Sequence, residues 1–495
     1  MKTNSLDFDA QALREKILDL AMRGKLVKQD PNDEPASVLL EKIKAEKAEL
    51  VKEKKIKKSK PLPEITDDEK PFHIPDSWKW VRGEDIVSLI GDGLHGTPVF
   101  SKEGVPFVNG SNLIDGKISL TKSTKFVSEE EYLKYKKDLL PGTLFLSLNG
   151  TLGKVAKYHN EKIVLGKSAG YFSLIDVKMQ DFIFYFLQSA IFKKYYDSKY
   201  TGSVIKNIPL KALRECIIPL PPLEEQSRIA AKIAQLFALL RKVESSTQQY
   251  AELQTLLKSK VLDLAMRGKL VEQDPHDEPA SVLLEKIKAE KAELVKEKKI
   301  KKSKPLPEIT DDEKPFDIPD SWEWGRLGDI CLSNIGLTYK PSQKSEKPTK
   351  TIILRANNVE ANELNKENVI FLDIDNLKEK YYLKENDILM AVRSGSKRLV
   401  GKSAVVTPQF VGFSFGAFMS KIRILSANSW YVDYFLNSAA FRSQLGDANT
   451  TTINQITQGM INNFVLPLPP LSEQNRIAAK IAQLFALLRK DESSN

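Results

Sequence analysis

The sequence predicts an α+β protein. It has two globular α/β domains separated by long antiparallel coiled-coil helices, with pseudo-two-fold symmetry and circularly permuted repeats. Three observations predict this fold class. A long segment occurs twice almost without change, and a second, shorter segment follows the same pattern. The repeated segments have apolar residues at helical spacing, whereas the segments between them contain short β-type runs.

The two repeats divide the chain into constant and variable parts. Residues 18–80 return at 262–324, and four of these 63 positions differ: Lys28/Glu272, Asn32/His276, His73/Asp317 and Lys79/Glu323. The segment "PLPPLEEQSRIAAKIAQLFALLRK" at 219–242 returns at 467–490 with two differences in 24 positions. The segments between, 81–218 and 325–466, differ in length by four residues and differ almost everywhere in sequence. The chain therefore reads as connector, variable block, connector, variable block and half-connector.

The connector is predicted to be a long helix. Apolar residues recur at steps of three and four, and Thr247 and Gln254 take seam positions across a polar middle: Ile229, Ile233, Leu236, Leu240, Val243, Tyr250, Leu257, Val261 and Leu264. Pro222 precedes the start and Gly268 is a plausible stop, which predicts one helix over 224–267. Because Ser and Thr are poor residues in the middle of a helix, two shorter helices broken near Ser245–Ser246 are the alternative.

The chain ends complete this pattern. The C-terminus supplies only the first half of the connector helix, and the N-terminus supplies only the second half, in which Leu13, Ile17 and Leu20 align with Leu257, Val261 and Leu264. The protein is therefore two copies of one unit, closed by bringing the two termini together. The domains expected from this arrangement are a half-connector, second helix and Pro-rich link (1–76), a first variable domain (77–218), a central connector (219–320), a second variable domain (321–466) and a C-terminal half-connector helix (467–495).

Each connector also carries a basic run, which in the first copy holds Lys52, Lys54, Lys55, Lys57, Lys58 and Lys60. Such a run is more often a solvated surface than a contact with phosphates or a partner, and the sequence leaves both readings open. The segment "KPLPEITDDEKPF" that follows is expected to be an extended, Pro-rich link into the variable block.

The variable blocks are predicted to share a fold but not a surface. Strand-like runs occur at 104–113 and 142–150 in the first block and at 351–359 and 386–396 in the second, and a helix is expected at 185–192 and 434–441. Aligned on that skeleton, the polar residues at strand ends and turns differ: Asn109 meets Arg355, Ser111 meets Asn357, Asn112 meets Asn358, Asn149 meets Arg393, and Lys154 meets Lys402. Arg pairs with guanine and Asn with adenine, and Lys neutralises phosphate, so two such polar sets fit two different base sequences. Ordinary turn chemistry is the alternative for each single Asn.

Signals of catalysis are weak in this sequence. The segment "GSKRLVGKS" at 395–403 has five residues between its glycines where a phosphate loop needs four. The four histidines, His73, His95, His159 and His276, show no metal-ligand spacing. The Asn/Asp-Pro-Pro-aromatic motif of an amino-methyltransferase is missing, because "LPPL" lacks both the amide or acid and the aromatic residue.

Composition agrees with a polyanionic partner. The 495-residue chain has a formal net charge of +10 and a pI near 9.1, which favours nucleic acid but also fits a merely basic soluble protein. Two cysteines are too few for a disulfide framework, so we expect a reducing, cytoplasmic location. No apolar run is long enough to span a membrane, and the polar N-terminus is not a signal peptide.

The paired "PDSWxW" motifs (75–80 and 319–324) and the paired "PLPPLxEQxRIAxKI" motifs together resemble the specificity (S) subunit of type I restriction–modification systems. The resemblance covers essentially the whole chain. The segment "HGTPVFSKEGVPF" at 95–107 is also similar to the start of many target-recognition domains in that family. The second block has "IGLTYKPSQKSEKPTK" in place of the HGTP loop, so no role carries over from His95 or Thr97 to that block.

The resemblance implies a non-catalytic subunit. Each variable block would be a target-recognition domain that reads one half of a bipartite, asymmetric site in double-stranded DNA, and the helices would set the spacer and dock two methyltransferase (M) subunits. Restriction (R) subunits would join the full complex. This chain would bind no cofactor, whereas partner subunits would use S-adenosylmethionine, ATP and Mg²⁺ for adenine-N6 methylation and ATP-dependent cleavage.

The polar alignment and the resemblance together nominate a set of DNA-binding residues. It comprises Thr97, Lys102, Asn109, Ser111, Asn112, Asn149, Thr151, Lys154, Lys206, Asn207, Arg355, Asn357, Asn358, Arg393, Ser394, Ser396, Lys397, Arg398, Lys402 and Asn454. We expect no catalytic and no metal-binding residues. The alternative function is a stand-alone coiled-coil DNA-binding regulator or scaffold, and the missing motifs disfavour a self-sufficient nuclease or methyltransferase.

Overall fold

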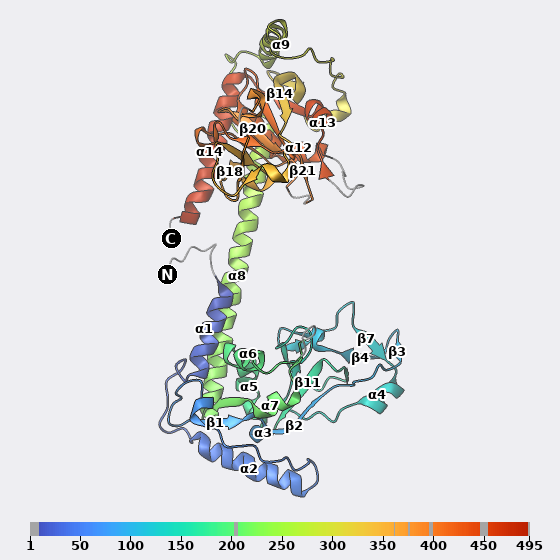
Figure 1. The fold of residues 1–495 in the computed structure, drawn as a ribbon, viewed down its shortest axis with the longest axis vertical. Helices are drawn as coiled ribbons and strands as arrows, with labels where there is room; N and C mark the ends of the chain where they lie inside the picture. Colours follow the sequence, from blue (N-terminus) through green and yellow to red (C-terminus); the bar gives the residue numbers. More distant parts are fainter. Residues whose placement is uncertain are drawn as a thin grey trace. The chain divides into compact units, whose positions relative to one another are not determined.

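The computed structural model describes residues 9–201, 206–360, 362–374, 377–395, 399–445 and 454–493. The chain divides into two compact units between Ser246 and Thr247. We call residues 9–246 the first unit and residues 247–493 the second unit. Each unit holds one variable block and the connector segments that pack against it (Figure 1).

One helix contributes to both units. Helix α8 (Leu223–Met266) runs without interruption through Ser245 and Ser246, so the prediction of a single connector helix is confirmed and the broken alternative is wrong. It begins directly after Pro222, and its end is followed by Gly268 at φ +65°. The seam side chains Ile229 and Ile233 are buried, whereas Val243 and Tyr250, nearer the middle of the helix, are exposed.

The described part of the first unit contains, besides α8, the helices α1 (Ala10–Met22), α2 (Ala36–Lys52), α3 (Gly83–Ile86), α4 (Glu129–Tyr135), α5 (Gln180–Phe186), α6 (Ala190–Asp197) and α7 (Leu210–Glu215). Its strands include β1 (Lys79–Arg82), β2 (Val87–Asp92), β3 (Phe100–Ser101), β4 (Val105–Val108), β5 (Leu113–Ile114), β6 (Lys117–Ile118), β7 (Lys125–Val127), β8 (Thr143–Ser147), β9 (Val155–Lys157), β10 (Val164–Leu165), β11 (Ala169–Leu174) and β12 (Ile217–Leu220).

The described part of the second unit follows a similar order, without an α-helix equivalent to α4, with α9 (Ala280–Lys296), α10 (Leu327–Ile330), α11 (Ser429–Leu436), α12 (Ala439–Gln444), α13 (Gln458–Asn463) and α14 (Leu471–Ser493). Its strands include β13 (Glu323–Arg326), β14 (Cys331–Ile335), β15 (Lys344–Ser345), β16 (Thr351–Leu354), β17 (Val359–Glu360), β18 (Glu363–Leu364), β19 (Ile370–Leu372), β20 (Asp387–Ala391), β21 (Arg393–Ser394), β22 (Ser403–Val405), β23 (Ser414–Phe415), β24 (Met419–Ile424), β25 (Asn454–Gln455) and β26 (Val465–Leu468).

Both variable blocks are built on the same pair of four-stranded sheets. The central sheet has the order β2-β11-β8-β9 in the first unit and β14-β24-β20-β22 in the second. The outer sheet has the order β10-β4-β7-β3 in the first unit and β15-β19-β16-β23 in the second. In each central sheet the middle strand β8 or β20 is buried along its whole length, because helices cover one face of the sheet and a second apolar cluster covers the other. The prediction of a shared fold with different sequences is confirmed.

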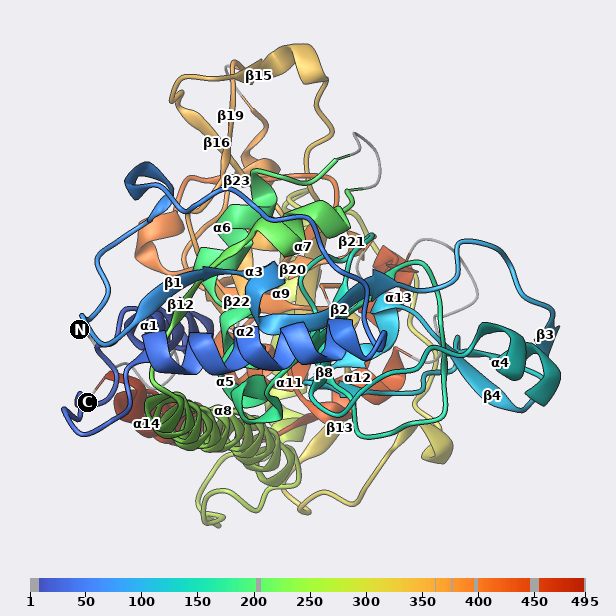
Figure 2. The same cartoon turned by 90° about the horizontal axis from the view of Figure 1, so that it is seen from below.

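The connector helices pair within each unit in antiparallel fashion. In the first unit Arg14 Nη1 donates to Glu244 Oε1 at 2.9 Å near one end of the pair, and Arg228 Nη1 donates to Asp33 Oδ1 at 3.0 Å near the other. Figures 1 and 2 show α1 alongside the first part of α8. In the second unit Gln254 Nε2 donates to the Leu488 carbonyl at 2.9 Å across α8 and α14. The polar seam position Gln254 is therefore buried and satisfied.

The two repeated sequence motifs meet at the base of each variable block. Strands β1 and β12 pair antiparallel, and β13 and β26 do the same with equivalent register. The indole of Trp78 donates to Glu225 at 2.9 Å, and Trp322 donates to Glu473 at the same distance. Burial raises the pKa of both carboxyl groups. The motif that opens each block is thus bound to the motif that closes it.

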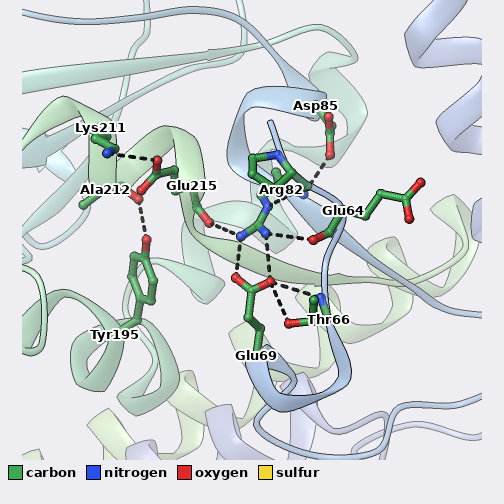
Figure 3. A network of polar contacts seen from close by, with 10 residues as sticks. Glu64, Thr66, Glu69, Arg82, Asp85, Tyr195, Lys211, Ala212 and Glu215 are labelled. Atoms are coloured by element: carbon green, nitrogen blue, oxygen red, sulfur yellow. Dashed lines mark hydrogen bonds and ion pairs between the residues drawn. The ribbon is translucent and has the colours of Figure 1, made fainter. Parts of the chain in front are cut away.

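An arginine fixes the Pro-rich link to this base. Figure 3 shows the Arg82 guanidinium facing the Glu69 carboxylate, with the carbonyl oxygens of Glu64 and Glu215 beside it. The two N–H···O distances to Glu69 are 2.8 and 2.9 Å. The second unit repeats the network with Arg326 and Glu313 at 3.0 and 2.8 Å. A bidentate pair of this kind holds the extended link in one orientation.

The expected helices at 185–192 and 434–441 are each two helices. Ser189 interrupts the first, since its hydroxyl accepts from the Phe192 N–H at 3.3 Å and donates to the Phe186 carbonyl at 2.7 Å. Ser438 does the same between α11 and α12. A serine that caps the next helix competes with the preceding one for the backbone, which the apolar spacing alone did not reveal.

Candidate nucleic-acid interface

Three loops of the first unit meet at one end of its sheets. Ser168, just before β11, donates its hydroxyl to Asn109 Oδ1 at 2.9 Å, directly after β4. The Gly110 N–H donates to the same hydroxyl at 2.9 Å, and the Leu148 N–H donates to the Ser168 carbonyl at 2.9 Å. We call residues 109–112, 148–153 and 166–168 the first loop cluster.

A fourth segment joins this cluster. Asn207 forms an isolated antiparallel bridge with Asn149, and it exchanges backbone hydrogen bonds with Thr201 at 2.9 Å. The Lys206 ammonium lies 4.4 Å from the centre of the Tyr200 ring. The structure therefore brings the predicted residues of 149–151 and 206–207 together, although more than fifty positions separate them in sequence.

The second unit forms the equivalent cluster from equivalent loops. The Gly416 N–H donates to the Leu354 carbonyl at 3.1 Å, and the Val392 N–H donates to the Phe418 carbonyl at 2.9 Å. Strand β21 pairs with β25, which places Arg393 opposite Gln455. We call residues 355–358, 392–395, 416–418 and 454–457 the second loop cluster.

Two predicted residues do not belong to the exposed surface. The side chain of Asn112 is 3% exposed and that of Asn358 is 0% exposed. Each caps a 3-10 turn by accepting from the backbone N–H three residues earlier, at 3.0 Å from Asn109 and 2.8 Å from Arg355. Their amide nitrogens donate to partners inside the domain. The prediction that Asn112 and Asn358 contact DNA is therefore corrected, because these side chains shape the loop from inside.

The remaining nominated residues fall into several places. Ser111, Thr151 and Asn357 are exposed within the clusters, and Asn149 is half-buried there with its amide 3.5 Å from the Lys167 carbonyl. Thr97 is exposed three residues beyond Leu94, which bridges Gly166. Lys102 is exposed in the β3–β4 turn, at the opposite end of β4 from Asn109, so it lies outside the cluster.

Part of the nomination lies beyond what the structure describes. Ser396, Lys397 and Arg398 are outside the described residues, and for Asn454 the structure describes only the backbone, in β25. Ser394 is half-buried in β21, next to Arg393.

The two lysines of the β-hairpins have a different setting from the clusters. Lys154 lines a groove of about 1090 Å³ together with Lys117, Lys157 and Arg241, in which α8 forms one wall. Lys402 occupies the equivalent position before β22 and is half-buried. The groove joins variable to constant residues. Its basic residues were not apparent as a group from the sequence, because Lys117, Lys154 with Lys157, and Arg241 come from three separate segments; Asp115 and Glu244 line the groove as well.

The clusters differ in the polar side chains at two equivalent positions. Where the first has Asn109 and Asn149, the second has Arg355 and Arg393. Arg355 donates to the Asn368 carbonyl at 2.7 Å, and its guanidinium is thereby held at the edge of its loop. The Arg393 guanidinium carbon lies 5.3 Å from the centre of the Phe418 ring. Arginine and asparagine offer different hydrogen-bond patterns to base edges, so the two surfaces suit different sequences.

Sequence reasoning missed two residues of the clusters. Lys167 is exposed between the loops that carry Asn109 and Asn149, and Phe418 is 54% exposed at a neighbouring position of the second cluster. Both follow a glycine, Gly166 or Gly416, whose backbone bridges another loop in the same way. Aligning "LGKSAG" with "SFGAFM" on that glycine would have found them.

The described residues show no metal site and no activated thiol. No group of three or more His, Cys, Asp or Glu side chains in the described ranges is placed to hold a metal ion. Burial raises the pKa of both Cys216 and Cys331 to about 12, so each thiol stays protonated at neutral pH. Across the described ranges, no helix combines the length and the apolar character needed to cross a membrane.

Comparison with known proteins gives a consistent result. A family model described as type I restriction modification DNA specificity domain matches residues 75–254 and 319–494. The chain is 34% identical to the type I restriction enzyme EcoAI specificity subunit of Escherichia coli, over 98% of this chain and 90% of that protein. It is 31% identical to the EcoEI specificity subunit of the same species, over 97% of this chain and 89% of that protein.

A solved structure supports the fold independently. A chain from work on the complex assembly and conformational transition of the type I R-M system superposes with a TM-score of 0.57 at 20% identity, covering 86% of this chain and 94% of that chain. The family model matches two domains that begin at the opening motifs, and the relatives are similar over nearly the whole length. This chain therefore belongs to the type I restriction–modification DNA specificity family.

Proposed function

We propose that this chain is the non-catalytic specificity subunit of a type I restriction–modification complex, in which each variable domain reads one half of a bipartite DNA site. The observation that carries the proposal is the pair of loop clusters. The same strands and turns build both clusters on a repeated frame, yet their half-buried polar side chains differ at Asn109/Arg355 and Asn149/Arg393. Different polar sets on one scaffold predict different bases in the two half-sites, hence an asymmetric target.

The constant parts would serve the partners. The connector helices are nearly identical in both copies, so we infer that they present the same surface to two methyltransferase subunits and fix the spacer between the half-sites. Restriction subunits would join this assembly. S-adenosylmethionine, ATP and Mg²⁺ would then be used by the partner subunits and not by this chain, and flipping of the target adenine would fall to the methyltransferase.

The test is a methylation map of one strain with and without this gene. The partner methyltransferase gene stays present in both. We expect one bipartite, non-palindromic adenine-methylation motif to vanish in the deletion strain and to return when the gene is restored on a plasmid. A map that does not change contradicts the proposal.

A second experiment separates this function from a stand-alone DNA-binding regulator. The regulator would bind a specific duplex tightly as the purified chain alone. The specificity subunit is expected to bind the bipartite duplex tightly only after methyltransferase subunits are added, measured by fluorescence anisotropy at one fixed salt concentration. Equal affinity with and without the partner would favour the regulator.

A further inference from the structure

The second loop cluster contains an aromatic residue that packing inside the domain does not account for. Phe418 is 54% exposed, but its backbone is fixed, since its carbonyl accepts from the Val392 N–H at 2.9 Å and from the Arg393 N–H at 3.2 Å. Its counterpart in the first cluster is Ser168, which faces inward and binds Asn109 and Gly110. The same loop position thus serves the interior in one unit and is open to solvent in the other.

Arg393 uses this ring as a support. Its guanidinium carbon lies 5.3 Å from the centre of the Phe418 ring, within the range of a cation–π contact. Within the described residues, no side-chain hydrogen bond or ion pair of the Arg393 guanidinium is found. A guanidinium that contacts a ring through its face keeps its in-plane N–H groups available, and these groups form the fork that matches O6 and N7 of guanine.

We propose that Arg393 and Phe418 act as one reader of a guanine–thymine step in the major groove, in which Arg393 pairs with the guanine and Phe418 contacts the thymine 5-methyl group. The proposal rests on the proposed function of the chain. Phenylalanine is one of the side chains that make apolar contact with this methyl group. A wedge between stacked bases would need both faces of the ring, but Arg393 already covers one face. The geometry therefore favours contact with the methyl group.

The first cluster provides the internal control. It has Asn149 where the second has Arg393, and Ser168 where the second has Phe418. Ser168→Ala should affect only the half-site read by the first unit. Changes at Arg393 and Phe418 should affect only the half-site read by the second unit.

The test uses the full chain with its methyltransferase subunits and synthetic duplexes of the mapped bipartite target. Deoxyuridine replaces the thymine and so removes one methyl group, and 7-deazaguanine replaces the guanine and so removes N7. For the unaltered complex we expect deoxyuridine to weaken binding about fourfold, which corresponds to one buried methyl group, and 7-deazaguanine to weaken it about tenfold. The 7-deazaguanine effect should vanish in Arg393→Ala, and the deoxyuridine effect in Phe418→Ala.

Several outcomes overturn the proposal. The first is that the half-site read by the second unit contains no adjacent guanine and thymine. The second is that the unaltered complex binds the thymine and deoxyuridine duplexes equally. The third is that the deoxyuridine effect persists in Phe418→Ala. Phe418→Leu, which keeps an apolar side chain, should retain part of the discrimination and shows that the loop still folds. If the complex binds no bipartite duplex, the proposed function itself fails, whereas specific binding without methyl discrimination overturns only this inference.

Discussion

Arg82 and Arg326 stand just beyond the last repeated residue, at the point where constant sequence gives way to variable sequence. Each guanidinium forms a bidentate pair with a carboxylate of the Pro-rich link, Glu69 or Glu313. Each also donates to a backbone carbonyl near the C-terminal end of its block, that of Glu215 or Asn463. The hydrogen bonds from Arg82 favour the ionised form of Glu69 and hold the pKa of this carboxyl group at about 2. A single residue of the variable block thus fixes that block to the constant frame.

Glu69→Gln should destabilise the first unit at neutral pH but not in acid. The pKa of Glu69 is about 2 in the folded chain against an ordinary 4.5, so the carboxylate stabilises the fold above pH 4.5 and loses this contribution as the pH falls toward 2. We expect a loss of about 1 kcal/mol at pH 7, since water reaches this carboxylate and weakens the pair. Thermal unfolding from pH 7 to pH 3 should show the two melting temperatures converging.

Two matched variants control this experiment. Glu313→Gln removes the repeated network and should behave in the same way. Lys70→Ala removes only the contact with exposed Asp67 and should leave the melting temperature unchanged. A pH-independent difference for Glu69→Gln would contradict the ionic account.

Asp433→Asn is expected to stabilise the second unit above neutral pH. Burial raises the pKa of Asp433 to about 7, although Ser403 donates to its carboxyl group at 2.6 Å. The pKa of Asp433 in the folded chain exceeds the ordinary value of 3.8, so the fold favours the protonated carboxyl group. Its contribution to stability is therefore complete below pH 3.8 and is lost as the pH rises to 7. The melting temperature of the asparagine variant, minus that of the unaltered chain, should rise between pH 4 and pH 7 and then stay level. The exposed Asp138→Asn serves as control, and a difference that falls with pH would refute this account.

At the scale of single elements, the ends of the connector helices depend on backbone conformation. Helix α1 is followed by Gly24 at φ +66°, and α8 is followed by Gly268 at φ +65°. These left-handed residues turn the chain toward the opening motif. An added Cβ at Gly24 would lie 2.5 Å from the Pro75 ring and 3.3 Å from Trp78. Glycine is therefore required here by conformation and by contact together.

Gly24→Ala should lower the free energy of unfolding of the first unit by about 2 kcal/mol. About half of this loss comes from the left-handed conformation and the rest from displacing Pro75. Urea denaturation measures it. Gly96→Ala is the matched control, because nothing lies within 4 Å of its added Cβ, and it should change little. Similar losses in both variants would point to a general effect of alanine in loops.

The continuous helix α8 also carries a prediction, which rests on its proposed role in setting the spacer. Four residues inserted after Ser246 lengthen the helix by about 6 Å. They add slightly more than one full turn, so the part beyond the insertion ends up rotated by only about 40°. We expect both half-sites to be kept and the spacer to grow by about two base pairs, as read from a methylation map. A two-residue insertion rotates the helix by about half a turn and should abolish modification. An unchanged spacer in the four-residue variant would contradict the proposal that α8 sets the spacer.

At the scale of the whole molecule, the repeated frame makes the variable blocks exchangeable. Strand β1 pairs with β12, and β13 pairs with β26 in equivalent register. The arginine–glutamate pair, Arg82–Glu69 or Arg326–Glu313, is present in both units. Each block therefore contains the same attachment to the frame, while the loop clusters at its other end differ. The fold separates what must be constant from what determines recognition.

A chain with residues 325–466 in place of 81–218 should therefore fold and modify a symmetric target. Both half-sites would then be the one that the second unit reads, because both clusters would carry the same side chains. A methylation map of cells that express this chain with the partner methyltransferase should show a palindromic bipartite motif. The reverse duplication should give a palindrome of the other half-site. A motif that retains both original half-sites would contradict the assignment of one half-site to each domain.

The sequence alone determined the repeated organisation, the helical character of the connector, the antiparallel arrangement of the long helices and the family resemblance. These features depend on spacing along the chain, and apolar periodicity or near-identical repeats record such spacing directly. The glycines after the helices and the repeated opening and closing motifs could also be recognised in the sequence, because each is a short local pattern. That the connector is one helix through Ser245 and Ser246 was decided by the structure.

Only the tertiary structure decided which polar residues face outward. Asn109 and Asn112 look alike in the sequence, but a 3-10 turn leaves the first half-buried between the loops and buries the second completely as its cap. Phe418 and Lys167 escaped notice because their neighbours in space come from other loops, and Ser189 divides a helix that apolar spacing joins. A residue's exposure depends on which strands bring its loop together with others. That is a property of long-range pairing, which no local pattern in the sequence contains.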